Sequence, residues 1–158
     1  MSNKKVHMVE SIIIKASAEN IFEYVSNSNN DPKWRTEVDR MDVQGEIKVG
    51  TLIVEYSSFY KFLHTITPAE IKEFDKPNKI ILETPENHPT WLQVIRTIKK
   101  IGNEECTFTY EVAFSIDFMK QIMPFTPPAA LIVMWYRPRI KKYLRNLKGL
   151  LEQSKGQK

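Results

Sequence analysis

The segment YRPRIKKYLRNLKGLLE, residues 136–152, decides how this chain can fold. Its apolar residues recur every three or four positions, which is the spacing of an amphipathic helix with one apolar face. That face consists of Tyr136, Ile140, Tyr143, Leu144, Leu147, Leu150 and Leu151. Pro138 lies within the pattern and predicts a kink or a break at that point. The segment therefore predicts a long C-terminal helix that needs a large apolar surface to pack against.

The preceding part of the chain supplies such a surface as a series of short strands. Seven stretches are rich in β-branched and aromatic residues and are separated by turn residues. They are Val6–Lys15, Val38–Gln44, Thr51–Tyr60, Leu63–Phe74, Lys79–Thr84, Trp91–Ile101 and Glu105–Ser115. Short separators of this kind favour an antiparallel meander. Since a sheet buries one face only when something long covers it, we expect the sheet to curve around the C-terminal helix.

Two short helices are expected between the first and second strands. Ser17 is a good N-cap for a helix that carries Phe22 and Val25. Asp31-Pro32 opens a second helix that carries Trp34. Residues 1–158 are therefore expected to form one α+β domain, with a curved seven-stranded antiparallel sheet around a long C-terminal helix. A ligand-sized space opens between the two wherever side chains do not fill it.

The last two strands have one register that brings their apolar side chains together. If Gly102 to Glu104 form the loop, the facing pairs are Leu92–Phe114, Val94–Val112, Arg96–Tyr110 and Ile98–Phe108. This register carries Arg96 inward, where a buried guanidinium needs a partner. That partner is either an internal carboxylate or the polar head of a ligand. In the second case an acidic or carbonyl-bearing amphiphile, such as a fatty acid, is the natural candidate.

Composition and charge exclude several classes of protein. The chain is 42% hydrophobic and 27% charged, which argues against a disordered or fibrous protein. Cys106 is the single cysteine, so no internal disulfide forms, and a reducing compartment is expected. The longest apolar run, Ala129–Tyr136, is far shorter than the ~20 residues of a membrane span. We therefore expect a soluble cytoplasmic protein, either a monomer or a homodimer.

The positive charge of the chain is concentrated at its C-terminal end. From Arg137 onward there are eight Lys or Arg and one Glu, so the other 136 residues carry −3 of the total +4. This distribution does not indicate a nucleic-acid-binding protein. The stripe formed by Arg137, Lys141, Arg145 and Lys148 predicts either a solvated helix face or transient contact with an anionic membrane.

The sequence contains no motif of a known catalytic or metal centre. His7, His64 and His88 are scattered, without the spacing of zinc ligands. GEIKVGT, residues 45–51, places Thr51 where a phosphate-binding loop needs lysine. We therefore expect no metal and no cofactor, and we name no catalytic residue.

A series of short motifs resembles the START-like superfamily. The motifs are ASAENIFEYVSNSNNDPKW (16–34), VQGEIKVGT (43–51), AEIKEFDKPNKI (69–80), FTYEVAF (108–114) and LKGLLE (147–152). The superfamily includes the polyketide cyclase/dehydrase proteins, the coenzyme Q-binding proteins and the birch-allergen-type plant proteins. The resemblance extends from about Val6 to Glu152. It implies the helix-grip fold, in which a curved sheet wraps the long helix around an apolar cavity.

By this resemblance the expected function is the binding or transport of a small hydrophobic ligand, such as a lipid, an isoprenoid or an aromatic polyketide. The expected ligand-binding residues are Trp34, Tyr56, Arg96, Phe108, Tyr110, Phe114, Met123 and Tyr136. One alternative is a cyclase or dehydratase, which needs an acid or base such as His64, Glu55 or Tyr56 facing the cavity. Another is a protein-interaction domain, as in chaperone activators of this fold. The sequence leans against an enzyme, because it carries no catalytic signature.

Overall fold

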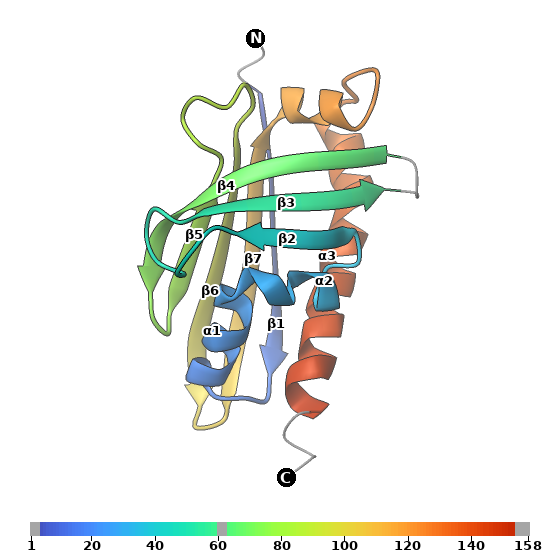
Figure 1. The fold of residues 1–158 in the computed structure, drawn as a ribbon. Coiled ribbons are helices and arrows are strands. Elements are labelled where there is room, and N and C mark those ends of the chain that lie inside the picture. The colour runs from blue at the N-terminus through green and yellow to red at the C-terminus, as the bar shows by residue number, and fades with distance from the viewer. Residues whose placement is uncertain (1–3, 60–62, 154–158) are drawn as a thin grey trace.

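One antiparallel sheet and one long helix dominate the computed structural model, which describes residues 4–59 and 63–153 (Figure 1). The elements are β1 (Lys5–Ile14), α1 (Ala18–Ser26), η1 (Ser28–Asn30), α2 (Asp31–Trp34), β2 (Val38–Val43), β3 (Leu52–Phe59), β4 (Leu63–Asp75), β5 (Lys79–Glu83), β6 (Leu92–Gly102), β7 (Glu105–Ser115), η2 (Ile116–Gln121) and α3 (Ala129–Gln153), where η marks a 3-10 helix. The predicted α+β order is confirmed, including the short helices after the first strand.

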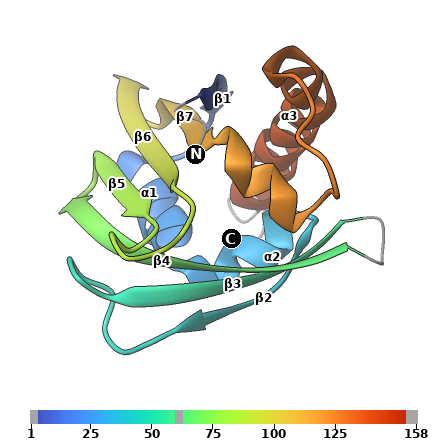
Figure 2. The same ribbon diagram turned by 90° about the horizontal axis from the view of Figure 1, so that it is seen from above.

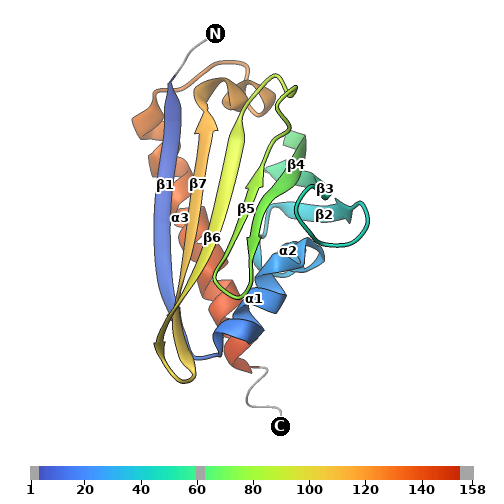
Figure 3. The same ribbon diagram turned by 90° about the vertical axis from the view of Figure 1, so that its left-hand side faces the viewer.

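The sheet curves around α3. Its strand order is β1-β7-β6-β5-β4-β3-β2, so β1 and β2 form the two edges. Viewed from above, the strands surround the short helices and η2, and α3 lies across the open side (Figure 2). The side view shows α3 running behind β1, β7 and β6 along most of their length (Figure 3). This is the helix-grip arrangement expected from the apolar face of the C-terminal segment.

Helix α3 buries the face that its sequence pattern predicts. Its buried side chains are Ile132, Ile140, Tyr143, Leu144, Leu147 and Leu151. The helix continues through Pro138, so it is not broken there. Pro138 is exposed, and buried residues on either side of it hold the two halves in one helix. Within the described residues, no helix is long and apolar enough to cross a membrane.

The predicted register of the last two strands is confirmed, but its loop is not. Leu92 pairs with Phe114, Arg96 with Tyr110 and Lys100 with Cys106, as the three-residue loop required. Near the turn the register shifts, and Gly102 pairs with Glu105. The loop is therefore two residues long, and the irregularity next to Ile101 absorbs the additional residue. The apolar pairs decide the register further along the strands, whatever the turn.

The short helices α1 and α2 contribute buried side chains to one end of the core. Ser17 caps α1, since its hydroxyl oxygen accepts a hydrogen bond from the backbone N–H of Asn20 at 3.2 Å. Pro32 lies in the first turn of α2, where its missing N–H costs nothing. The indole of Trp34 is fully buried and packs edge-on against Phe108, 6.2 Å between ring centres. Helix α2 thus anchors Asp31 and Arg35 beneath the sheet.

Candidate ligand-binding cavity

A cavity lies between α3, η2 and the inner face of the sheet. Its walls are mostly apolar and include Phe59, Val112, Phe114, Phe118, Ile132 and Trp135. Its polar residues are Arg35, Glu55, Thr65, Thr67, Tyr110 and Tyr136. An apolar chamber with a few polar groups is the usual form of a small-molecule site. The space that the sequence predicted between sheet and helix is therefore present.

The cavity is small. Its volume is about 60 Å³. Because roughly 10–15 Å³ of such space holds one water molecule, the cavity has room for a few waters. A cavity that binds benzene is on the order of 150 Å³. An aromatic ring, a lipid or a polyketide therefore needs a wider cavity than this one.

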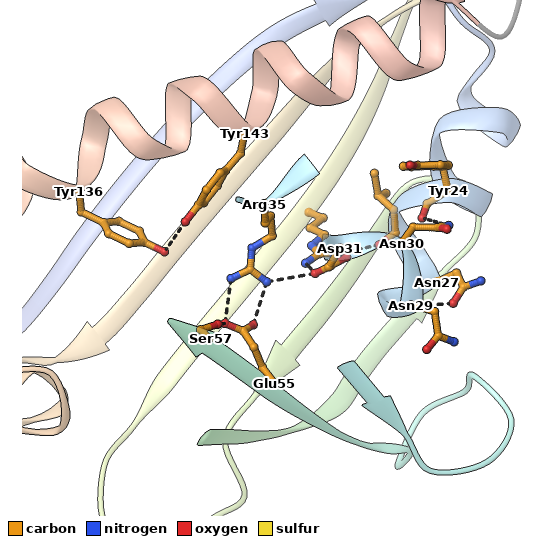
Figure 4. A network of polar contacts seen from close by, with 12 residues as sticks. Tyr24, Asn27, Asn29, Asn30, Asp31, Arg35, Glu55, Ser57, Tyr136 and Tyr143 are labelled. Carbon is orange, nitrogen blue, oxygen red and sulfur yellow. Dashed lines mark hydrogen bonds and ion pairs between the residues drawn. The ribbon is translucent and has the colours of Figure 1, made fainter. Parts of the chain in front are cut away.

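A buried chain of charges forms the polar end of the cavity (Figure 4). Arg35 donates to Glu55 through both terminal nitrogens, at 2.8 and 3.2 Å, and to Asp31 at 3.0 Å. Asp31 also accepts two hydrogen bonds from Arg96, at 3.0 and 2.5 Å. Ser57 donates to Glu55 at 2.7 Å. Two guanidinium groups and two carboxylates therefore neutralise one another inside the protein.

Glu55 is held as a carboxylate. Burial raises the pKa of its carboxyl group, but the charge of Arg35 and the hydrogen bonds from Arg35 and Ser57 outweigh burial, and the net pKa is lowered. A general base works best with a pKa near the working pH. Glu55 is therefore an ionised hydrogen-bond acceptor in a closed ion pair, and a weak proton acceptor.

Three tyrosines meet this polar end. The hydroxyl groups of Tyr136 and Tyr143 lie 3.4 Å apart, and both rings extend from α3 toward Arg35 (Figure 4). Burial raises the pKa of Tyr110, Tyr136 and Tyr143, so all three remain protonated donors at neutral pH. The Tyr110 hydroxyl is buried and has no hydrogen-bond partner among the described residues. A buried hydroxyl of this kind is available to an oxygen atom of a ligand.

Three of the eight predicted ligand-binding residues line the cavity: Tyr110, Phe114 and Tyr136. Trp34 and Phe108 are fully buried in the core, where their rings pack against each other. Met123 packs against the core and is not among the residues that line the cavity. The structure thus brings Tyr110 and Phe114 of β7 together with Tyr136 of α3, and leaves Trp34, Phe108 and Met123 outside the wall.

Tyr56 lies on the wrong face of β3 to line the cavity. Glu55, Ser57 and Phe59 point toward the core side, and Tyr56 alternates with them and stacks under Arg40, with 3.7 Å between the guanidinium carbon and the ring centre. His64 is exposed and contacts Ser58 at 2.8 Å. Of the three acid or base candidates, only Glu55 faces the cavity. Both faces of β3 carry apolar and polar residues, so alternation alone could not orient it.

Arg96 has an internal partner. Besides Asp31, it donates to the backbone oxygen of Val25 at 2.6 Å, and its side chain is 1% exposed. The internal-carboxylate alternative is therefore the correct one, and the hypothesis that Arg96 receives the head of a fatty acid is withdrawn. Asp31 lies 65 residues away in the chain, which is why no local pattern identified it.

Sequence reasoning missed Arg35, which contributes most to the polar end of the cavity. The residue directly follows the buried Trp34 at the end of α2, and only the packing of α2 against β2 and α3 places it beside Glu55 of β3. Thr65 and Thr67 of β4 were also missed. Their alternation with the exposed His64 and Ile66 is a signal that could have identified an inward polar face. Within residues 4–59 and 63–153, no cluster of three His, Cys, Asp or Glu side chains forms a metal site.

Comparison with known families and structures gives a consistent result. The family model described as polyketide cyclase/dehydrase and lipid transport matches residues 5–152. No curated protein sequence matches the chain. A START superfamily protein from Mycobacterium smegmatis is 13% identical with a TM-score of 0.76, over 94% of this chain and 98% of that one. The match thus extends over nearly the whole of both proteins.

Two other similar structures are of proteins named as aromatase/cyclases. The ZhuI aromatase/cyclase from Streptomyces sp. R1128 is 9% identical with a TM-score of 0.72, over 95% of both chains. The di-domain ARO/CYC StfQ of the steffimycin pathway is 10% identical with a TM-score of 0.74. The alignment covers 96% of this chain but only 52% of StfQ, so this chain spans about half the length of that protein. At these identities the likeness shows a common fold.

Proposed function

The chain belongs to the polyketide cyclase/dehydrase and lipid transport family, and from that membership and the cavity we propose that it binds a small, mostly apolar molecule. The ligand carries a hydroxyl or carbonyl oxygen at one end. Its apolar part lies against Phe114, Phe118 and Trp135, and its oxygen accepts a hydrogen bond from the tyrosines at the polar end.

The observation that carries this proposal is the Tyr110 hydroxyl. It is buried beside the cavity without a hydrogen-bond partner among the described residues. Leaving a buried donor unsatisfied costs about 1–3 kcal/mol. A ligand oxygen placed against Tyr110 removes that cost, whereas a pure hydrocarbon does not. The site should therefore prefer an oxygen-bearing ligand over a hydrocarbon of the same shape.

The charges at the polar end favour a neutral ligand over an acid. Asp31 and Glu55 balance Arg35 and Arg96, so the site has no spare positive charge for a carboxylate. A carboxylate would also lie close to the ionised Glu55. Among lipids, isoprenoids and aromatic polyketides, a phenolic or keto aromatic molecule fits this end best, because the surrounding walls contain aromatic rings.

The Tyr110→Phe variant tests the proposal with phenol and benzene as probes. In wild-type protein we expect phenol to bind more tightly than benzene, measured by chemical-shift titration. Tyr110→Phe should weaken phenol binding about 2- to 10-fold, the range for loss of one neutral hydrogen bond, and leave benzene unchanged. Tyr56→Phe, on the outer face of β3, is the matched control. Equal phenol affinity in wild type and Tyr110→Phe would contradict the role of Tyr110.

A cyclase or dehydratase is the second candidate. It is favoured by Glu55, the one carboxylate among the described residues that lines the cavity. Its lowered pKa and its ion pair with Arg35 weaken it as a base. We therefore expect deuterium exchange at the methyl group of acetophenone, followed by NMR, to be no faster with wild type than with Glu55→Gln. Exchange that is severalfold faster with wild type would favour the enzyme over the binding protein.

A further inference from the structure

The outward side of α3 combines exposed apolar and basic side chains. Leu131 is 53% exposed and Met134 is 73% exposed. Arg137, Lys141 and Arg145 continue the same stripe along the helix, since the positions are three or four residues apart. We call these five residues the outer face of α3. A shallow groove runs along it, and Met134 and the three basic residues take part in its lining.

The basic residues of this face are only partly neutralised by the rest of the protein. Lys141 and Arg145 are exposed and have no acidic partner among the described residues. Arg137 pairs with Glu10 at 2.8 Å. Lys148, which the sequence placed in the same stripe, instead pairs with Glu152 at 2.7 Å and donates to a backbone oxygen of β1. The unbalanced charge therefore lies at Lys141 and Arg145, about two to three helical turns from Met134.

Contact with a lipid surface would bury the exposed apolar side chains of α3. Phe125, in the connection that leads into α3, is also exposed, at 63%. Scattered exposed apolar residues are ordinary, but Leu131 and Met134 lie on the same stripe of α3 as the unpaired Lys141 and Arg145. Basic side chains bordering large apolar ones are characteristic of helices that lie in the interface of an anionic membrane. Nucleic acid would use the cations and leave Leu131 and Met134 without a role.

We propose that the outer face of α3 docks onto an anionic lipid bilayer. Lys141 and Arg145 contact lipid head groups, and Leu131 and Met134 enter the interfacial region. The same turns of α3 carry Ile132 and Trp135, which line the cavity. Docking therefore brings one wall of the cavity next to the membrane. The proposal rests on the helix surface alone and holds whether or not the cavity binds the ligand proposed above.

Vesicle co-sedimentation tests the docking. The full chain should bind vesicles of phosphatidylcholine with 30% phosphatidylserine and bind pure phosphatidylcholine weakly. Lys141→Ala/Arg145→Ala should lower the partition coefficient about 30-fold, because each basic residue near an anionic surface contributes on the order of fivefold. Binding should also weaken with added salt. The matched control is Lys99→Ala/Lys100→Ala at the end of β6, which removes the same charge from another exposed place.

Two outcomes would overturn the proposal. One is equal binding of the wild type to both kinds of vesicle. The other is an equal loss for the Lys141/Arg145 and Lys99/Lys100 variants, which would assign the effect to net charge alone.

A fluorescent probe tests the orientation independently. Cys106 is buried at 1% exposure, so a thiol-reactive dye labels an introduced Met134→Cys selectively. Its emission should shift to the blue when phosphatidylserine vesicles are added, as the dye enters the interface. The same dye on Lys99→Cys should not shift. A shift at Lys99→Cys and none at Met134→Cys would contradict docking through α3.

Discussion

Replacing Asp31 with alanine is expected to lower the free energy of unfolding by about 3–5 kcal/mol, the usual cost of removing one partner of a buried ion pair. Asp31 is fully buried and accepts hydrogen bonds from both Arg96 and Arg35. Arg35 keeps Glu55 as a partner, but Arg96 keeps only the backbone oxygen of Val25. The variant thus leaves a buried cation without a counter-charge. Urea denaturation of wild type and variant measures the difference.

Two further variants separate charge from packing in this experiment. Asp42→Ala, at an exposed position of β2, is the matched control and should change stability by less than about 0.5 kcal/mol. Arg96→Met in the Asp31→Ala background should recover part of the loss, because it removes the uncompensated charge and keeps an apolar side chain of similar length. If Asp31→Ala lowers the free energy of unfolding by less than about 1 kcal/mol, the ion pair contributes little to stability.

Deleting residues 138–158 is expected to abolish cooperative folding. The deletion removes the buried residues Ile140, Tyr143, Leu144, Leu147 and Leu151. At roughly 1.5–3 kcal/mol for each large side chain, their burial contributes about as much as the whole stability of a typical domain, 5–15 kcal/mol. No other long helix in the described part of the chain covers the inner face of the sheet. Circular dichroism and thermal denaturation of the truncated chain provide the test.

A pair of point substitutions checks that the loss comes from the buried face of α3. Leu147 is 0% exposed, so Leu147→Asp places a charge in the core and should prevent folding as the deletion does. Arg145→Asp, two residues away on the exposed side, should leave the melting curve nearly unchanged. A truncated chain that still unfolds cooperatively would mean that the sheet does not depend on α3.

The family match and the similar structures define the fold more closely than they define the chemistry. The match covers residues 5–152, and the three similar structures described above are 9–13% identical to this chain over nearly its whole length. Because a shared fold at this level of identity does not define a function, the function has to be inferred from the residues of the cavity. In this chain those residues combine apolar walls, a neutralised set of charges and protonated tyrosine hydroxyls. That combination favours binding of a neutral ligand over proton transfer.

Local patterns determined most of the fold. The period of the C-terminal segment predicted α3, and stretches of β-branched and aromatic residues between turn residues predicted the strands. Ser17 and Pro32 marked the short helices. The register of β6 and β7 also followed from the sequence, because a shift by one residue would have exposed a whole apolar face. These features depend on neighbours in the chain or on one pairing between adjacent strands. The turn after Lys100 did not follow, since an irregularity costs little at an exposed end.

Only the tertiary structure decided how the buried charges pair and which residues line the cavity. Arg96 was predicted to lie inside, but its partner Asp31 is 65 residues away, and Arg35 reaches Glu55 only because α2 packs against β2 and α3. Tyr56 and Glu55 are neighbours on a strand whose two faces are similarly mixed, so alternation could not say which of them points inward. The sequence therefore determined the elements, the sheet and the presence of a buried arginine. The composition of the cavity depended on long-range packing, in which each partner comes from a different element of the chain.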